Sequence, residues 1–134
     1  MKELTLLASI DSMGTVAQWV EEQLEELGCS MKAQMQLAVA VDELFSNIAR
    51  YAYGDGEGEA TVRIEKLDRP AIRITFLDRG VPYDPLKKED PDTTLSSEER
   101  QIGGLGIYMV KKSMDAVTYR HQDGQNILMI EKNI

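Results

Sequence analysis

Two neighbouring segments of the chain alternate apolar and polar residues, and this alternation limits the possible folds more than any other feature. In residues 61–67 and 71–77, apolar side chains occupy every second position between charged or hydroxyl side chains. Residues 68–70, Asp-Arg-Pro, form a turn, so the two segments are predicted to pair as a β-hairpin. Because successive side chains of a strand point to opposite faces, this hairpin has one apolar and one wet face.

Three further strands are predicted, at residues 2–8, 117–120 and 126–131, and most of the predicted strands have one apolar and one polar face. A sheet covered by helices on both sides would instead contain continuous apolar runs. We therefore predict the α/β class in its α+β form. It is a two-layer sandwich in which a largely antiparallel mixed sheet carries helices on one face.

Three helices are predicted from apolar spacing and from their start and stop signals. The first follows an N-cap at residues 11–12 and ends at Gly28. The second is capped by Ser30 and extends to about Tyr53, and the third covers residues 104–115. The apolar stripe that we expect to face the core from the second helix comprises Met31, Met35, Ala38, Val41, Phe45, Ile48 and Ala52.

Length, charge and rare residues exclude several classes of function. A chain of 134 residues suffices for one domain, residues 1–134, with one core. The net charge of −8 argues against direct nucleic-acid binding, which needs clustered Lys and Arg. Without an apolar run long enough for a bilayer or a signal peptide, we expect no membrane partner and a cytoplasmic location. One cysteine, Cys29, and one histidine, His121, exclude an internal disulfide and a zinc site of the usual ligands.

Glu43 and Asn47 lie four residues apart on the second predicted helix and therefore point the same way. An amide oxygen is a suitable hard ligand for Mg²⁺, which takes its other ligands from water and phosphates. A carboxylate one turn away could orient or deprotonate a nucleophile near a γ-phosphate. The alternative is a solvent-facing polar stripe that also includes Ser46 and Arg50.

Asp78 ends a predicted strand, and Gly80 follows two residues later. A carboxylate at a strand end can accept a hydrogen bond from an exocyclic amine such as that of adenine, and a glycine lets a ligand approach the backbone. A simple Asp-x-Gly turn is the alternative. About residues 81–103, with three prolines, form a long loop, and loops of this length in small domains are often functional lids.

Gly103, Gly104 and Gly106 surround Leu105 at the predicted start of the third helix. Their exposed N–H groups and the helix dipole favour an anion such as phosphate. Gly106 lies inside the helix, where glycine costs roughly 1 kcal/mol against alanine, so a packing or ligand reason should offset that cost. A flexible hinge is the alternative.

These motifs resemble, in order, those of the GHKL ATPase superfamily. Residues 42–53 resemble its N-box, residues 78–85 its first glycine box and residues 103–115 its second. Residues 119–128 are similar to the end of the branch that contains anti-sigma-factor serine kinases. The resemblance covers about residues 37–134 and implies a Bergerat ATP-binding fold, the same two-layer sandwich.

The resemblance also implies a role for each matching residue. Asn47 would bind Mg²⁺, Glu43 would be the general base, and Asp78 would recognise the adenine amine. Tyr51 stands where the family often has histidine, and Pro82 where it often has a second glycine. The residues implied to contact ATP are Asn47, Arg50, Asp78, Gly80, Pro82, Gly103, Gly104, Leu105 and Gly106.

By this resemblance the chain is predicted to be an ATP-binding anti-sigma regulatory factor with serine/threonine protein kinase activity. Its expected partners are a sigma factor, an anti-anti-sigma protein that it phosphorylates, and a second copy in a homodimer. Three alternatives stay open. The chain could be a non-catalytic nucleotide-binding partner-switch module, the ATPase domain of a histidine kinase with a separate phospho-acceptor, or an α/β domain with no ligand.

Overall fold

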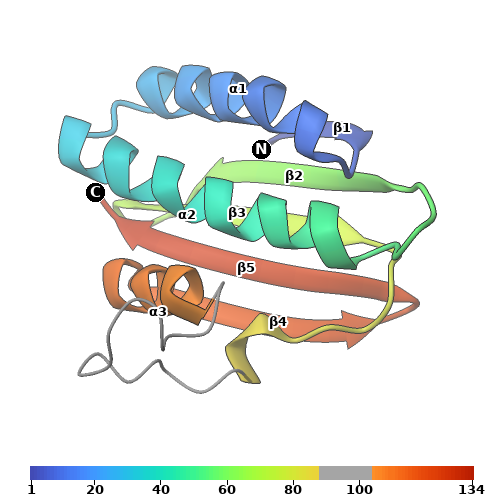
Figure 1. Ribbon diagram of the computed structural model, residues 1–134. Coiled ribbons are helices and arrows are strands. Elements are labelled where there is room, and N and C mark those ends of the chain that lie inside the picture. Colours follow the sequence, from blue (N-terminus) through green and yellow to red (C-terminus); the bar gives the residue numbers. More distant parts are fainter. Residues whose placement is uncertain (88–103) are drawn as a thin grey trace.

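The computed structural model describes residues 1–87 and 104–134, which form one sheet and the helices that cover it (Figure 1). The strands are β1 (Lys2–Leu7), β2 (Glu59–Lys66), β3 (Ala71–Asp78), β4 (Ala116–Gln122) and β5 (Gln125–Asn133). The helices are α1 (Met13–Glu26), α2 (Met31–Tyr51) and α3 (Gly104–Ser113), with single 3₁₀ turns at Ile10–Ser12 and Pro85–Lys87. In the described part of the chain, no helix has the length and apolar character needed to cross a membrane.

The strand order is β1-β2-β3-β5-β4, and α1, α2 and α3 cover the same face of the sheet (Figure 1). The predicted two-layer sandwich with helices on one face is therefore confirmed. The described strands pair antiparallel throughout, so the sheet is not mixed. Tight turns connect β2 to β3 and β4 to β5 as β-hairpins. The helical hairpin α1–α2 connects β1 to β2, which pair antiparallel.

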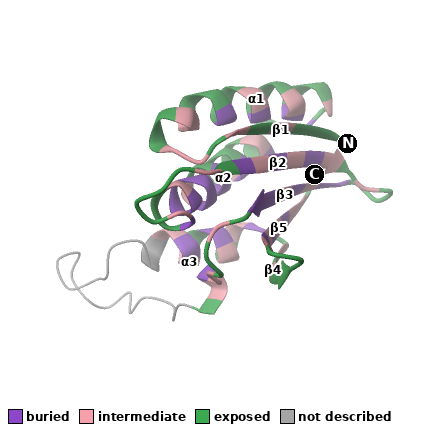
Figure 2. Ribbon diagram, turned by 90° about the vertical axis from the view of Figure 1, so that its right-hand side faces the viewer, coloured by how far each residue is buried: buried purple, intermediate pink, exposed green. Residues whose placement is uncertain are grey.

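The core lies between the sheet and the helices, where Figure 2 shows the buried residues facing one another. The predicted alternation holds, since the apolar positions of both hairpin strands are buried and the charged positions between them are not. Full burial of an aliphatic or aromatic side chain stabilises the fold by about 1.5–3 kcal/mol. The largest fully buried side chains of the two layers are Leu24, Leu37, Leu44, Phe45, Ile64, Ile72, Ile74, Phe76, Ile107 and Ile130.

The core-facing stripe predicted for α2 is right in its second half and wrong in its first. Met31 and Met35 are 71% and 64% exposed, and Ala38 is also exposed. Ala33 and Leu37 face the core instead. This half of α2 carries two apolar stripes at helical spacing, and the one with Ala33 and Leu37 packs inward. The methionine stripe lines a groove between α1 and α2.

The structure likewise confirms one predicted N-cap and not the other. Ser30 caps α2 as predicted, because its Oγ accepts a hydrogen bond from the Ala33 N–H at 3.2 Å. Ser12 occupies the N-cap position of α1 but makes no side-chain cap bond. The 3₁₀ turn before it gives Ser12 helical backbone angles, whereas a capping serine has extended ones. Gly28, with φ of 76°, follows α1 as predicted.

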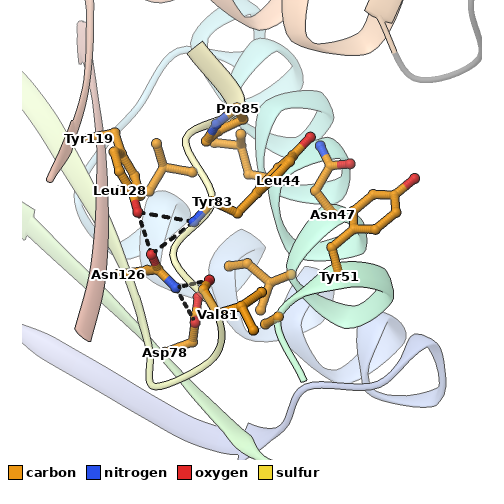
Figure 3. Close-up of a pocket in the computed structure, with 12 residues that line it drawn as sticks. Leu44, Asn47, Tyr51, Asp78, Val81, Tyr83, Pro85, Tyr119, Asn126 and Leu128 are labelled. Carbon is orange, nitrogen blue, oxygen red and sulfur yellow. Dashed lines mark hydrogen bonds between the residues drawn. The ribbon is translucent and has the colours of Figure 1, made fainter. Parts of the chain in front are cut away.

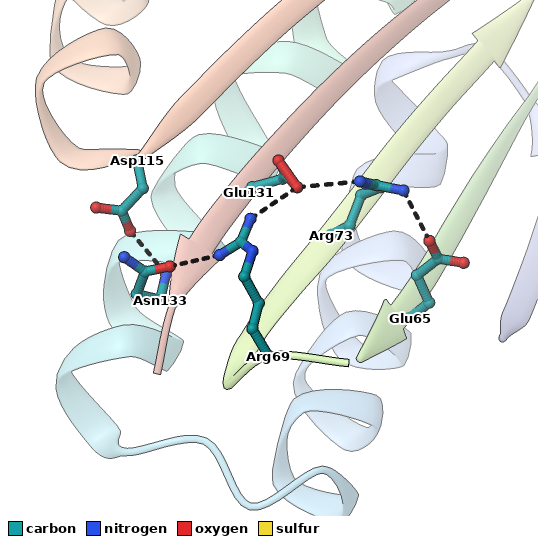
Figure 4. Close-up of polar contacts among 6 residues, drawn as sticks. All are labelled: Glu65, Arg69, Arg73, Asp115, Glu131 and Asn133. Carbon is teal, nitrogen blue, oxygen red and sulfur yellow. Dashed lines mark hydrogen bonds and ion pairs between the residues drawn. The ribbon is translucent and has the colours of Figure 1, made fainter. Parts of the chain in front are cut away.

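The uncovered face of the sheet carries a network of ion pairs (Figure 4). The Arg73 guanidinium donates to Glu65 at 3.2 Å and to Glu131 at 3.1 Å, and Arg69 donates to the same Glu131 oxygen at 3.0 Å. Arg69 also donates to Asn133 Oδ1 at 2.8 Å. The network ties the β2–β3 turn to β5. It accounts for two of the charged positions that alternate with apolar ones in the hairpin, Glu65 and Arg73.

Candidate functional site

Asn47 and Glu43 form a hydrogen-bonded pair on successive turns of α2. Asn47 is buried, and its Nδ2 donates to Glu43 Oε1 at 3.3 Å. Because this bond occupies the nitrogen end of the amide, Oδ1 of Asn47 is left without a hydrogen bond from any residue that the structure describes. The predicted pairing of these two residues is thus present in space, with an acceptor oxygen to spare.

Asp78 lies at the end of β3 with its side chain buried. Its Oδ1 accepts two hydrogen bonds, from the Gly80 N–H at 2.9 Å and from Asn126 Nδ2 at 2.8 Å. Oδ2 receives none within residues 1–87 and 104–134. The carboxylate is therefore fixed through one oxygen, and the other is available to a ligand that brings a donor.

Asn47 and Asp78 line the same pocket, between α2 and the β3–β5 end of the sheet (Figure 3). The rings of Tyr51 and Tyr83, both in its lining, lie 5.7 Å apart between centroids. The cavity volume is about 30 Å³, whereas small-molecule sites are commonly roughly 300–1,000 Å³. A nucleotide base therefore requires the pocket to open. The other lining residues are Leu44, Ile48, Ala52, Val81, Pro85, Tyr119, Asn126 and Leu128.

Glu43 lines a second hollow, a wide groove of about 510 Å³ on the outer side of α2. Three exposed apolar side chains, Ile10, Val39 and Met109, form part of its lining. Arg50 lies in this groove and not in the pocket with Asp78. The remaining lining residues are Met13, Asp42, Ser46 and Gly106. The Glu43–Asn47 pair thus joins a narrow pocket to an open groove.

Two of the predicted glycines lie where a side chain has no room. A β-carbon at Gly106 would lie 2.1 Å from the carboxyl carbon of Glu43, so the first turn of α3 rests against that carboxylate. A side chain at this position would therefore displace the Glu43 carboxylate, which gives a reason for a glycine inside the helix. A β-carbon at Gly80 would lie 2.0 Å from the carbonyl oxygen of Ala52. The next residue, Val81, donates its N–H to the same oxygen at 2.7 Å, which seats the chain on the end of α2.

The other predicted residues divide between the described and undescribed parts of the chain. Gly104 begins α3 as predicted, while Gly103 and most of the predicted lid, 81–103, fall outside the described residues. Nothing is described of the Leu105 side chain. Pro82 is exposed between β3 and the Pro85–Lys87 turn.

Asn126 and Tyr119 belong to the pocket although neither was predicted as a site residue. Asn126 occupies an inward position of β5, in phase with the buried Leu128 and Ile130. A polar residue on an otherwise apolar stripe is the sequence signal that marks it. Tyr119 is paired in register with Leu128, and its hydroxyl donates to Asn126 Oδ1. Burial, together with the negative charges of Asp84 and Asp78, raises the pKa of Tyr119 against the opposing bond from the Tyr83 N–H.

The donor set fits Mg²⁺ bound mainly through a ligand. No group of three Asp, Glu, His or Cys side chains converges among the described residues, so this part of the chain has no complete protein cage for a metal. Mg²⁺ usually takes one or two protein oxygens and completes its shell with water and phosphate. Oδ1 of Asn47, which accepts no hydrogen bond from the described residues, suits that arrangement.

Comparison with known proteins connects most of the chain to one family. Residues 6–132 match the model of the histidine kinase-like ATPase domain. The serine/threonine-protein kinase BtrW of Bordetella bronchiseptica is 27% identical over 84% of this chain and 79% of its own length. The serine-protein kinase RsbW of Listeria monocytogenes is 30% identical over 76% of this chain and 68% of its own length. RsbW of Bacillus cereus is 30% identical, and the match spans 60% of its length.

Two solved structures share the fold. A crystal structure of the RsbU and RsbW domains of a Mycobacterium tuberculosis protein aligns with a TM-score of 0.63 and 16% identity. The alignment covers 99% of this chain and 32% of that one. The mycobacterial sensor histidine kinase MprB aligns with a TM-score of 0.55 and 15% identity, over 99% of this chain and all of that one. At these identities the likeness extends to the architecture alone.

Proposed function

Because the chain belongs to the histidine kinase-like ATPase domain family, we propose that it is an ATP-binding anti-sigma regulatory factor with serine/threonine protein kinase activity. Relatives at about 30% identity are named serine kinases. The observation that carries the proposal is the convergence of Asn47 and Asp78 on one pocket, with Glu43 one helical turn away and facing an open groove.

In this proposal the pocket binds the adenine end of ATP. Asp78 accepts a hydrogen bond from the adenine amine through Oδ2, and Gly80 keeps the backbone close to the base. Asn47 Oδ1 holds Mg²⁺, which when bound supplies charge neutralisation at the phosphates. The first turn of α3 offers N–H groups and a positive dipole end to the same phosphates. Further nucleotide contacts are assigned to Arg50, Pro82, Gly103, Gly104, Leu105 and Gly106.

Glu43 acts on the protein substrate. Its carboxylate accepts the proton of a seryl hydroxyl as that oxygen forms a bond to the γ-phosphorus and the bond to the β–γ bridging oxygen breaks, releasing ADP. The groove beside Glu43 receives the seryl segment, and Ile10, Val39 and Met109 offer it apolar contacts. Catalysis is mainly positioning and charge neutralisation, because the transition state needs little covalent help.

The proposed protein substrate is an anti-anti-sigma protein. The second proposed partner is a sigma factor, which stays bound to this chain once the anti-anti-sigma protein is phosphorylated. A homodimer in the cytoplasm is part of the same proposal. A second candidate is a nucleotide-binding module without kinase activity. Tyr51 and Pro82, which stand where the resembling family often has histidine and glycine, are the observations that favour that candidate.

The test is phosphoryl transfer from γ-labelled ATP to a candidate anti-anti-sigma protein encoded near this gene. We expect Glu43→Ala to lower transfer by at least about 100-fold, while ATP affinity changes less than about threefold, because Glu43 lies outside the pocket lining. Glu22→Ala, on the exposed side of α1, is the matched control and should transfer normally. Unchanged transfer in Glu43→Ala would refute its role, and ATP binding without transfer in the wild type would favour the second candidate.

A further inference from the structure

A directed chain of hydrogen bonds leads from the loop after β3 to Asp78 (Figure 3). The Tyr83 N–H donates to the Tyr119 hydroxyl oxygen at 3.2 Å, and the Tyr119 hydroxyl donates to Asn126 Oδ1. Asn126 Nδ2 then donates to Asp78 Oδ1 at 2.8 Å and to the Val81 carbonyl at 2.9 Å. Asp78 and Asn126 are each 6% exposed, so water does not replace these bonds easily.

The direction of each bond in this chain is fixed by its neighbours. A backbone N–H can only donate, so the Tyr119 oxygen accepts from Tyr83 and its hydrogen is free to point at Asn126. The oxygen end of the Asn126 amide therefore faces Tyr119, and its nitrogen end faces Asp78. A reversed amide would place its oxygen against two other acceptors, the Asp78 carboxylate and the Val81 carbonyl.

The chain also fixes which part of Asp78 meets a ligand. Oδ1 is occupied by two protein donors, and Oδ2 is the carboxylate oxygen without one in the described part of the chain. A tyrosine hydroxyl keeps its hydrogen at neutral pH, and burial raises the pKa of Tyr119 further. Asp78 thus presents one free acceptor oxygen to the pocket, held in one orientation by Asn126 and Tyr119, which lie outside the glycine box at residues 78–85.

We propose that Asn126 and Tyr119 are positioning residues that make the pocket select a 6-amino purine over a 6-oxo purine. The inference rests on the proposed function, because it takes the pocket to be a purine site. An amine at C6 donates to the fixed Oδ2, whereas a 6-oxo group would bring a second acceptor against it. Asn126 and Tyr119 act through Asp78 and need not touch the base.

The test compares the affinities of ATP and ITP, which differ at C6, for variants of the full chain. Asn126→Asp places a second carboxylate beside Asp78. Asp78 then lacks the Asn126 donor that fixes Oδ1, and with it the orientation of Oδ2 toward the base, so we expect the ATP-to-ITP affinity ratio to fall at least about tenfold, through weaker ATP binding. A residue with a merely structural role would weaken both nucleotides together.

Two further variants keep the outcome clear. Tyr119→Phe removes only the hydroxyl that orients Asn126 and should lower the ratio about twofold to fivefold. Asn133→Asp makes the same substitution at an exposed position of β5, where the side chain accepts from Arg69, and should leave the ratio unchanged.

The outcomes separate this inference from the proposed function. The inference would be overturned if both variants, Asn126→Asp and Tyr119→Phe, fold and keep the wild-type ATP-to-ITP affinity ratio. ATP binding by the wild type would still support the proposed function in that case. Thermal unfolding shows whether Asn126→Asp folds. If it does not fold, an unchanged ATP-to-ITP ratio in Tyr119→Phe is enough to overturn the inference. A wild type that binds neither nucleotide would refute the proposed function, and the inference with it.

Discussion

At Gly106, a hydrogen atom in place of a side chain lets the first turn of α3 lie against the carboxylate of Glu43. The contact is to the end of a flexible side chain, so an added methyl group would move that carboxylate before it moved the backbone. Fold stability and chemistry therefore separate at this residue. The same distinction does not hold at Gly80, where the added carbon would meet the backbone of Ala52.

Gly106→Ala is predicted to keep or raise stability and to lower phosphoryl transfer. Alanine favours the helix by roughly 1 kcal/mol over glycine, while displacement of Glu43 by about 1 Å can cost on the order of 100-fold in rate. Thermal unfolding and the labelled-ATP assay measure the two effects. Gly14→Ala in α1, where an added β-carbon meets nothing within 4 Å, is the matched control and should change stability only. A Gly106→Ala protein with wild-type transfer would contradict the proposed effect of this contact on Glu43.

Cys29 is predicted to be unreactive in the folded protein. It is 8% exposed, and burial raises the pKa of its thiol, so less of the reactive thiolate is present at a given pH. At pH 8, reaction with a disulfide reagent should be at least about tenfold slower in the native than in the unfolded chain. The native rate should increase as pH rises toward the raised pKa. Equal native and unfolded rates would show that the thiol is accessible.

Among the elements, α2 brings most of the site together, since it supplies Glu43 and Asn47 and receives the β3 loop at its end. Its N-terminus was predictable because Ser30 follows a helix-ending Gly28 and precedes a long apolar pattern. Its first two turns were not, because the Met31–Met35 stripe and the Ala33–Leu37 stripe have the same spacing. Which of them packs inward depends on how α2 is rotated against the sheet, and local spacing does not determine that rotation.

Ser30→Ala is predicted to lower the free energy of unfolding by about 1 kcal/mol, because it removes the acceptor for the Ala33 N–H. Ser12→Ala is the matched control, since Ser12 occupies the N-cap of α1 without a side-chain cap bond, and its effect should be less than half as large. Urea denaturation of both variants measures the difference. Equal losses would mean that the Ser30 bond contributes nothing beyond loss of a surface hydroxyl.

For the whole molecule, the sequence predicts the architecture better than the site. One alternating hairpin, 61–67 and 71–77, was enough to require a sheet with one covered face, because strand alternation is a local property. Asn126 escaped prediction because its partner, Asp78, lies 48 residues away and the two meet only through the β3–β5 pairing. The placement of Glu43 and Arg50 in the groove, apart from Asp78 in the pocket, was also not predictable, because it depends on how α3 packs on α2.

The central claim is that a nucleotide binds between α2 and the β3–β5 end of the sheet. Nuclear magnetic resonance of the ¹⁵N-labelled chain during titration with MgATP tests it most directly. We predict that the side-chain amides of Asn47 and Asn126 and the backbone amide of Gly80 shift along one saturation curve. The backbone amides of Arg73 and Thr75, on the uncovered side, should stay in place. An unchanged spectrum at millimolar MgATP, or shifts confined to the uncovered face of the sheet, would contradict the account.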